Sequence, residues 1–171
     1  MPGNRAGLFN SQGPQGIILH ATRSGRDWGR DLIDADYWAL PARREFDATI
    51  NYVKAGAGPD RLGWNITAGP GILAEHLAPH EWGWNAGVHS RTYLAIEFAQ
   101  ARLGDQISDS TLDAAAWWVR ERALTHWPSM RLFLVHHSEL GQGIAQGKTD
   151  VCARGTPEAD EFRERFAALL R

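Results

Sequence analysis

The feature that most constrains the fold is a pair of short apolar runs that each carry a polar group. The run GIILHAT, Gly16 to Thr22, is rich in β-branched residues and predicts a buried strand with His20 near its end. The run TYLAIEFAQ alternates large apolar residues with small or polar ones, which predicts a second strand with Glu97 on the face opposite its large apolar side chains. Such strands indicate a buried β-sheet.

Helical patterns separate these strands. Apolar residues at helical spacing predict a helix over about 42–55, and capping residues from Ser108 open a long amphipathic helix in SDSTLDAAAWWVRERALTHW. Thr156 and Pro157 are typical of the start of a C-terminal helix. LGWNITAGPGILAEHL predicts a hairpin and RLFLVHH a further strand. This order predicts an α/β fold, a single domain with a central mixed β-sheet flanked by α-helices.

The length and charge of the chain narrow its function. Its 171 residues suit a single catalytic domain over 1–171, in which we expect the first ten residues or so and the loop 141–147 to be loosest. A balance of 18 Lys and Arg against 20 Asp and Glu offers no basic surface for nucleic acid or an anionic membrane. The first residues lack the apolar run of a signal peptide, and no stretch approaches the about 20 apolar residues of a membrane span. We therefore expect cytoplasmic synthesis, no membrane insertion and a monomer.

One segment, LFLVHHSELGQGIAQGKTDVC, concentrates potential metal ligands and titrating groups. They are His136, His137, Glu139, Asp150 and Cys152. Adjacent residues of a strand point to opposite faces, so only one of the two histidines can bind a metal directly. That histidine, His20 and one carboxylate or thiolate would supply the three protein ligands of a catalytic zinc site. In an extended segment Lys148, Asp150 and Cys152 all face one way, which leaves the third ligand open between Asp150 and Cys152.

Several motifs follow one another between about Gly16 and Asp150. They are IILHAT, GWNITAGPGI, WNAG, LAIEF and HHSEL followed by GKTD. Together they resemble the zinc-dependent N-acetylmuramoyl-L-alanine amidases (amidase type 2), a family that includes cell-wall-recycling amidases, amidase-type phage lysozymes and peptidoglycan recognition proteins. The last motif is the most specific, because it is similar to the family's Gly-His-Ser-Asp segment followed by Lys-Thr-Asp. The resemblance implies hydrolysis of the amide bond between N-acetylmuramic acid and L-alanine in peptidoglycan or muropeptides.

The resemblance also implies a role for individual residues. It implies one Zn²⁺ per chain, held by His20, His137 and Asp150. Cys152 is the runner-up ligand, because it follows the motif where relatives have Pro-Gly. Glu97 matches the glutamate that helps to activate water, and Lys148 matches the lysine that stabilises the developing oxyanion.

The substrate cleft is expected among the tryptophans. Trp64 stands where many relatives have a tyrosine that helps to activate water, which shifts that role towards Glu97. Trp82 and Trp84 would share one side of an extended EWGWNAG segment, and Asn85 replaces a histidine that is frequent in the family. We expect Trp64, Trp82, Trp84 and Asn85 to line the cleft that receives glycan or peptide.

A non-catalytic peptidoglycan-binding module is the alternative function, since this fold also serves recognition. Retention of the ligand candidates together with Glu97 and Lys148 favours the enzyme. Two settings stay open. One is a phage endolysin that reaches the cell wall after release through a holin, and the other is a bacterial recycling amidase that acts on imported muropeptides.

Overall fold

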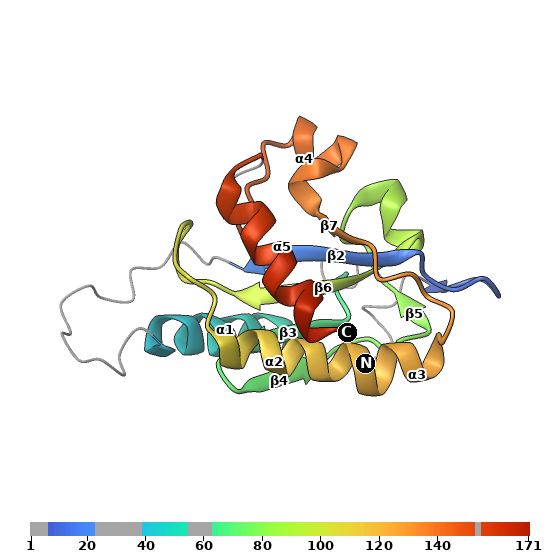
Figure 1. Ribbon diagram of the computed structural model, residues 1–171, viewed down its shortest axis with the longest axis horizontal. Helices are drawn as coiled ribbons and strands as arrows, with labels where there is room; N and C mark the ends of the chain where they lie inside the picture. Colours follow the sequence, from blue (N-terminus) through green and yellow to red (C-terminus); the bar gives the residue numbers. More distant parts are fainter. Residues whose placement is uncertain (1–6, 23–38, 55–62, 153–154) are drawn as a thin grey trace.

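The computed structural model describes residues 7–22, 39–54, 63–152 and 155–171. Within these residues five strands form one sheet in the order β4-β3-β6-β2-β7 (Figure 1). The strands are β2 (Gly16–Thr22), β3 (Ile66–Gly69), β4 (Ile72–Glu75), β6 (Tyr93–Ala99) and β7 (Leu134–His136). Strands β3, β6, β2 and β7 are parallel, whereas β4 is antiparallel to β3. The predicted mixed sheet is therefore confirmed.

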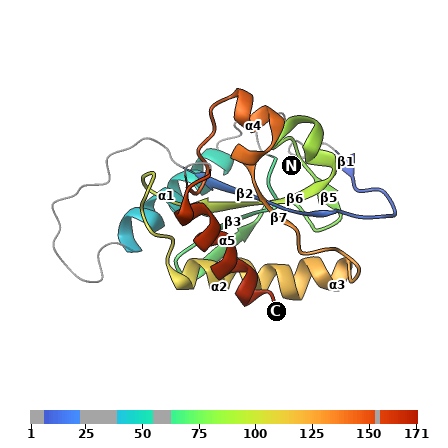
Figure 2. The ribbon, with the colours of Figure 1, turned by 45° about the horizontal axis from the view of Figure 1, so that its top comes forward.

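Two helical segments cover one face of this sheet. The first is α2 (Asp109–Trp118), which continues through the π-helical turn η3 (Val119–Ala123) into α3 (Leu124–His126), and the second is α5 (Pro157–Leu169). In Figure 2 α2 and α3 lie below the strands, and α5 runs from the level of the strands down to α2. Apolar side chains of β2, β3 and β6 form one core cluster with those of α2, η3 and α5. As predicted, Ser108 caps α2 and Thr156 caps α5.

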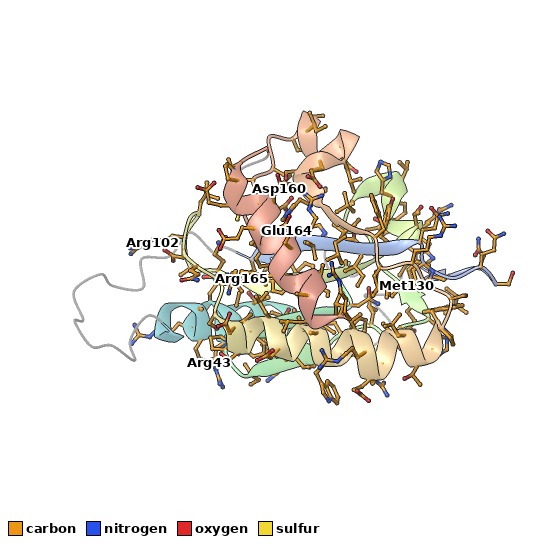
Figure 3. The ribbon with its side chains drawn as sticks, in the orientation of Figure 1. Arg43, Arg102, Met130, Asp160, Glu164 and Arg165 are labelled. Carbon is orange, nitrogen blue, oxygen red and sulfur yellow. The ribbon has the colours of Figure 1, made fainter. Side chains whose placement is uncertain are left out.

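The outward side of α5 is charged. Phe162 and Phe166 are buried against Phe98 of the sheet, with ring centroids 5.1 and 5.5 Å away. Asp160 and Glu164, which are labelled in Figure 3, are exposed. This division matches the predicted amphipathic pattern, in which the apolar stripe of the helix faces the core.

Helix α1 (Ala39–Lys54) packs near the carboxyl ends of β2 and β3. It begins earlier than the predicted 42–55, and the expected stop at Gly56 falls among residues 55–62, outside the described part. Its buried side is mixed, because Phe46 packs against the backbone of Gly69 while Glu45 and Thr49 are also buried. Thr22 at the end of β2 donates a hydrogen bond to Glu45 Oε1 at 3.1 Å, which ties this helix to the strand that carries His20.

The hairpin is confirmed, since β3 and β4 pair antiparallel around Pro70-Gly71. A separate two-stranded sheet joins β1 (Gly7–Leu8) to β5 (Glu81–Trp82). Residues 1–6 lie outside the described part, so the expectation of a loose N-terminus can be compared with the structure only from Gly7 onward. No helix of the described ranges has the length and apolar character needed to cross a membrane.

The segment after β7 differs from the prediction in two ways. The expected strand RLFLVHH shortens to Leu134–His136, and His137 begins a 3₁₀ turn, η4 (His137–Glu139). The expected loose loop 141–147 contains a helical turn, α4 (Gly141–Ala145), in which Ile144 N donates to Leu140 O at 2.9 Å. The glycines of GQGIAQG have low helix propensity, so the sequence did not predict this helical turn.

Candidate functional site

The register of the parallel strands brings a histidine and a glutamate together. His20 of β2 pairs with Glu97 of β6, and Thr67 of β3 follows in the same row. Paired residues on neighbouring strands lie about 4.8 Å apart and point to the same face. The large apolar residues of β6 are buried on the other face, as their alternation predicted. Glu97 therefore lies outside the apolar core, on the same face of the sheet as His20.

The side chains of the two adjacent histidines, His136 and His137, point to opposite faces of the sheet, as strand alternation predicts. His136 is 1% exposed, its Nε2 lies 3.1 Å from Ala159 O, and its ring packs near Phe162. His137 lies on the other side, with its ring centroid 4.7 Å from that of His20. His136 is a packed histidine of the core side, and His137 belongs to the site.

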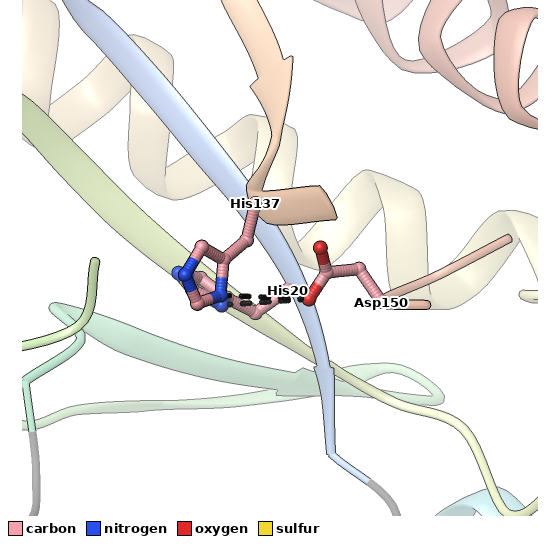
Figure 4. A group of neighbouring side chains, drawn as sticks. All are labelled: His20, His137 and Asp150. Atoms are coloured by element: carbon pink, nitrogen blue, oxygen red, sulfur yellow. Dashed lines mark ion pairs between the residues drawn. The ribbon is translucent and has the colours of Figure 1, made fainter. Parts of the chain in front are cut away.

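Asp150 joins His20 and His137 in the site, and its backbone has an unusual conformation. Its φ of 42° lies in the left-handed region, which aspartate tolerates better than most residues. Asp150 Oδ1 lies 3.7 Å from His20 Nδ1 and 3.8 Å from His137 Nδ1, as the dashed lines in Figure 4 mark. The Ser138 backbone N–H donates to Asp150 Oδ2. One carboxylate oxygen is therefore held by the backbone, and the other faces both imidazoles.

These three side chains suit a zinc ion. One ligand atom from each lies within 4.8 Å of the other two, and all three residues are buried. Ligands of a tetrahedral zinc, at about 2.0–2.2 Å from the ion, lie about 3.3–3.6 Å from one another. The carboxylate–imidazole separations of 3.7 and 3.8 Å need a small adjustment to reach that geometry, and the separation of the two imidazoles, within 4.8 Å, allows a larger one. Two imidazoles and one carboxylate also leave a fourth position for water or substrate.

The protonation of the imidazoles is compatible with metal binding. Burial lowers the pKa of His20 well below its ordinary value of 6.5, His137 and Lys148 lower it further, and Asn85 opposes them. Burial, with the charges of Lys148 and His89, lowers the pKa of His137 to about 4. Both rings are therefore neutral at pH 7, the form that binds metal ions.

The group opens into a cavity of about 370 Å³. Glu97 and Lys148 line it together with the three ligand candidates, so the structure brings all five residues to one place. Lys148 is exposed, and its backbone N–H donates to Gly143 O of α4 at 2.9 Å. The helical turn that replaced the expected loop thus fixes the backbone of the lysine beside the cavity.

Three of the four residues expected in the cleft also line this cavity. They are Trp64, Trp84 and Asn85. A Cβ at Gly63 would lie 2.0 Å from the carbonyl carbon of Trp84, so only glycine allows the two backbones to approach this closely. Asn85 Nδ2 donates to Gly63 O at 2.8 Å and to Gly83 O at 3.0 Å, which fixes the asparagine in the wall.

Trp82 and Cys152 lie elsewhere. Trp82 is 7% exposed and donates from Nε1 to Leu8 O, so it secures the small sheet and does not line the cavity. Its ring contacts that of Trp84, which is 46% exposed, in a T-shaped arrangement. Cys152 lines a different cavity, beside α5, because the turn at Asp150 interrupts the extended alternation that would have kept 148, 150 and 152 on one side.

Sequence reasoning missed two contributions to the site. The Ser138 N–H that holds Asp150 is a backbone group, and no side-chain pattern reports it. Gly147 and Thr149 line the cavity on either side of Lys148. Their position on either side of Lys148 in GKTD is the one feature of the sequence that could have predicted this.

Comparison with known proteins supports this fold. No protein-family model and no curated protein matches the chain. The solved catalytic domain of XlyA has a TM-score of 0.55 and 22% identity, over 99% of this chain and 92% of that one. The hydrolase AmiA of Staphylococcus aureus, solved with its ligand, has a TM-score of 0.56 and 12% identity, over 96% and 77% of the two chains.

A third similar structure is a recognition complex. It is the ectodomain complex of peptidoglycan recognition proteins LCa and LCx bound to tracheal cytotoxin, with a TM-score of 0.57 and 16% identity over 81% of this chain and 79% of that one. At these identities the similarity establishes the fold. The chain is therefore a single α/β domain of a fold that serves a hydrolase and recognition proteins, with a His-His-Asp group in an open cavity.

Proposed function

We propose that this protein is a zinc-dependent amidase that hydrolyses the bond between N-acetylmuramic acid and L-alanine in peptidoglycan or muropeptides. The observation that carries the proposal is the meeting of His20, His137 and Asp150 with Glu97 and Lys148 in one cavity. A binding module needs no general base beside a metal site. The motif order that resembles the amidases independently favours the same five residues.

The three ligand candidates would hold one zinc ion per chain. A zinc ion bound there supplies a Lewis acid that polarises the amide carbonyl and lowers the pKa of a water molecule to about 7. The protein supplies the ligand geometry, because His20 lies in β2, His137 directly follows the neighbouring strand β7, and the Ser138 N–H holds the carboxylate of Asp150. Asn85, held by its hydrogen bonds to Gly63 O and Gly83 O, lines the same cavity, where we expect it to contact the substrate.

Glu97 and Lys148 would carry the proton and charge changes of the reaction. Glu97 stands next to His20 in the strand register, so its carboxylate would accept a proton from the attacking water molecule in the cavity and deliver it to the departing amide nitrogen. Lys148 brings an ammonium group to the rim of the same cavity, where it opposes the negative charge that develops on the carbonyl oxygen. Trp64 and Trp84 offer apolar faces to the substrate.

The proposal is tested with a disaccharide peptide of defined structure, N-acetylglucosaminyl-N-acetylmuramoyl tetrapeptide. Zinc-loaded protein should release the free tetrapeptide, identified by mass spectrometry, and a chelator should stop the reaction. His137→Ala should be inactive, whereas the matched variant His136→Ala should keep zinc and activity with some loss of stability, because it removes only a packed ring. Binding of the muropeptide without any cleavage by zinc-loaded protein would instead support the recognition module.

A comparison of two substrates tests whether the protein is a phage endolysin or a bacterial recycling amidase. Rates on intact sacculi and on soluble anhydro-muropeptides distinguish an endolysin from a recycling amidase. An endolysin is expected to favour sacculi, and a recycling amidase soluble anhydro-muropeptides.

A further inference from the structure

A third cavity, of about 700 Å³, lies at the amino-terminal ends of β2, β6 and β7. Tyr93, Phe133, Arg131, Gln12 and Gln15 are among the residues that line it. In Figure 1 these strand ends lie at the right, whereas the arrowheads of β2 and β6 point to the left. His20 and Glu97 lie towards those carboxyl ends, so the cavity is separate from the candidate catalytic site.

A glycine between two aromatic residues shapes the floor of this cavity. Gly16 of β2 pairs with Tyr93 of β6, and on its other side it lies against Phe133, whose carbonyl accepts from Ile17 N at 2.9 Å. A Cβ at Gly16 would lie 2.3 Å from Phe133 O, so the row requires a residue without a side chain. The rings of Tyr93 and Phe133 therefore approach each other across the glycine, with centroids 6.4 Å apart and planes inclined by 35°.

The two rings form one rigid apolar strip that is open to solvent. Phe133 is 54% exposed, and the neighbouring Gln15 N donates to Thr92 O at 2.7 Å, which fixes the backbone on the Tyr93 side. Arg131 forms no ion pair with any residue of the described part, so its guanidinium can donate to a ligand. An exposed aromatic face next to unpaired donors is the arrangement that binding sites for small polar molecules use.

The chemistry of these groups fits a sugar. A pyranose ring presents an apolar face of C–H groups that can lie on an aromatic ring, and its edge carries hydroxyl groups and, in amino sugars, an acetamido oxygen. The side chains of Arg131, Gln12 and Gln15 provide the donors and acceptors that such an edge requires. A purely apolar partner would form no hydrogen bonds with these three exposed side chains, whereas the edge of a sugar ring would.

The position of the cavity relates it to the candidate catalytic site. Gly16 and His20 are four residues apart on β2, as are Tyr93 and Glu97 on β6, so both places lie on the same face of the sheet. Four residues of a strand span about 13 Å, which is the length of a few sugar residues. A small cluster of Ile18, Ala86 and Val135, with Leu140 packed on it, separates them.

We propose that the cavity between Tyr93 and Phe133 is a subsite that binds N-acetylhexosamine units of a glycan strand, outside the cavity where the amide is cleaved. The choice of an amino sugar rests on the proposed peptidoglycan function, whereas the cavity and its aromatic strip do not. The subsite holds the enzyme on polymeric substrate, and a single muropeptide has no need of it.

The test compares Phe133→Ala with Trp117→Ala, a control that removes another exposed aromatic side chain, 49% exposed, from α2 on the opposite side of the sheet. Tetra-N-acetylchitotetraose is titrated into each zinc-loaded protein by calorimetry, and backbone amide NMR locates the site. Phe133→Ala should weaken binding on the order of tenfold, as for loss of a central aromatic contact. It should keep wild-type turnover on a soluble muropeptide and lose several-fold in rate on sacculi, while Trp117→Ala changes neither.

Two results would overturn the subsite. One is a wild-type protein that does not bind the oligosaccharide, or whose amide shifts lie only around the catalytic cavity. The other is a Phe133→Ala variant with unchanged binding, or one whose only defect is a changed oligomeric state in sedimentation. Binding that depends on Phe133 in a protein without amidase activity would keep the subsite and reject the proposed function, so the two can fail separately.

Discussion

Replacement of Asp150 by asparagine is the sharpest test of the metal centre. Asparagine keeps an oxygen that can accept from the Ser138 N–H, and it tolerates the φ of 42° found at this position. The side chain is only 5% exposed, so its volume also matters, and the substitution conserves that volume. The substitution therefore removes the charged oxygen that faces both imidazoles with little effect on the fold.

The size of the effect follows from linkage between metal binding and folding. Loss of a group that merely supports a metal ligand lowers metal affinity about 10–100-fold, so loss of a ligand itself should cost about 100-fold or more. A 100-fold loss of affinity removes about 2.7 kcal/mol of the stabilisation that saturating zinc provides. For a chain of 171 residues this corresponds to a zinc-dependent rise in Tm that is smaller by about 5–11 °C.

The assay measures zinc content after dialysis and Tm with and without zinc, by calorimetry. Cys152→Ser is the matched control, since that thiol lines a different cavity and should keep both zinc and the full rise in Tm. If Asp150→Asn retained one zinc per chain and the full rise, while Cys152→Ser lost both, the ligand assignment would be refuted.

Three further predictions concern the base, the cleft and the pH dependence of stability. Glu97→Gln should keep zinc but turn over muropeptide about 100-fold more slowly, because an amide cannot accept the proton; near-normal turnover by the folded variant would place the base elsewhere. Trp84→Ala should raise KM several-fold with little change in Tm, whereas Trp82→Ala should lower Tm because that side chain is buried; kinetics and thermal melts that show the reverse pattern would contradict this division. Burial lowers the pKa of His76 to about 4, below its ordinary 6.5, so the unfolded chain takes up this proton first as the pH falls. The contribution of His76 is then complete above pH 6.5, and up to about 3 kcal/mol is lost as the pH falls to about 4. Urea unfolding of the wild type and of His76→Gln should show a shallower loss in the variant, and equal slopes would count against the assignment.

Local patterns were sufficient for most of the secondary structure. The β-branched run Gly16–Thr22 forms β2 with the predicted bounds, and the alternation in β6 separates Glu97 from the core. The cap at Thr156 and the apolar spacing after it define α5. These signals depend on neighbouring residues alone, because strand alternation, helix periodicity and capping act over a few positions of the chain.

The sequence alone determined which residue types were available for chemistry: His20, one of two adjacent histidines, Glu97 and the GKTD segment. Only the tertiary structure decided how they meet. The left-handed turn at Asp150 sends Cys152 to another cavity, the helical turn α4 fixes Lys148, and the small sheet buries Trp82 while Trp84 stays in the cleft. Asp150 is held by the Ser138 N–H and Trp82 by Leu8 O, and the periodicity of a single segment contains no information about such contacts between separate segments. The contact of Lys148 with Gly143 is local, but the glycines around it hide the helical turn from a propensity argument.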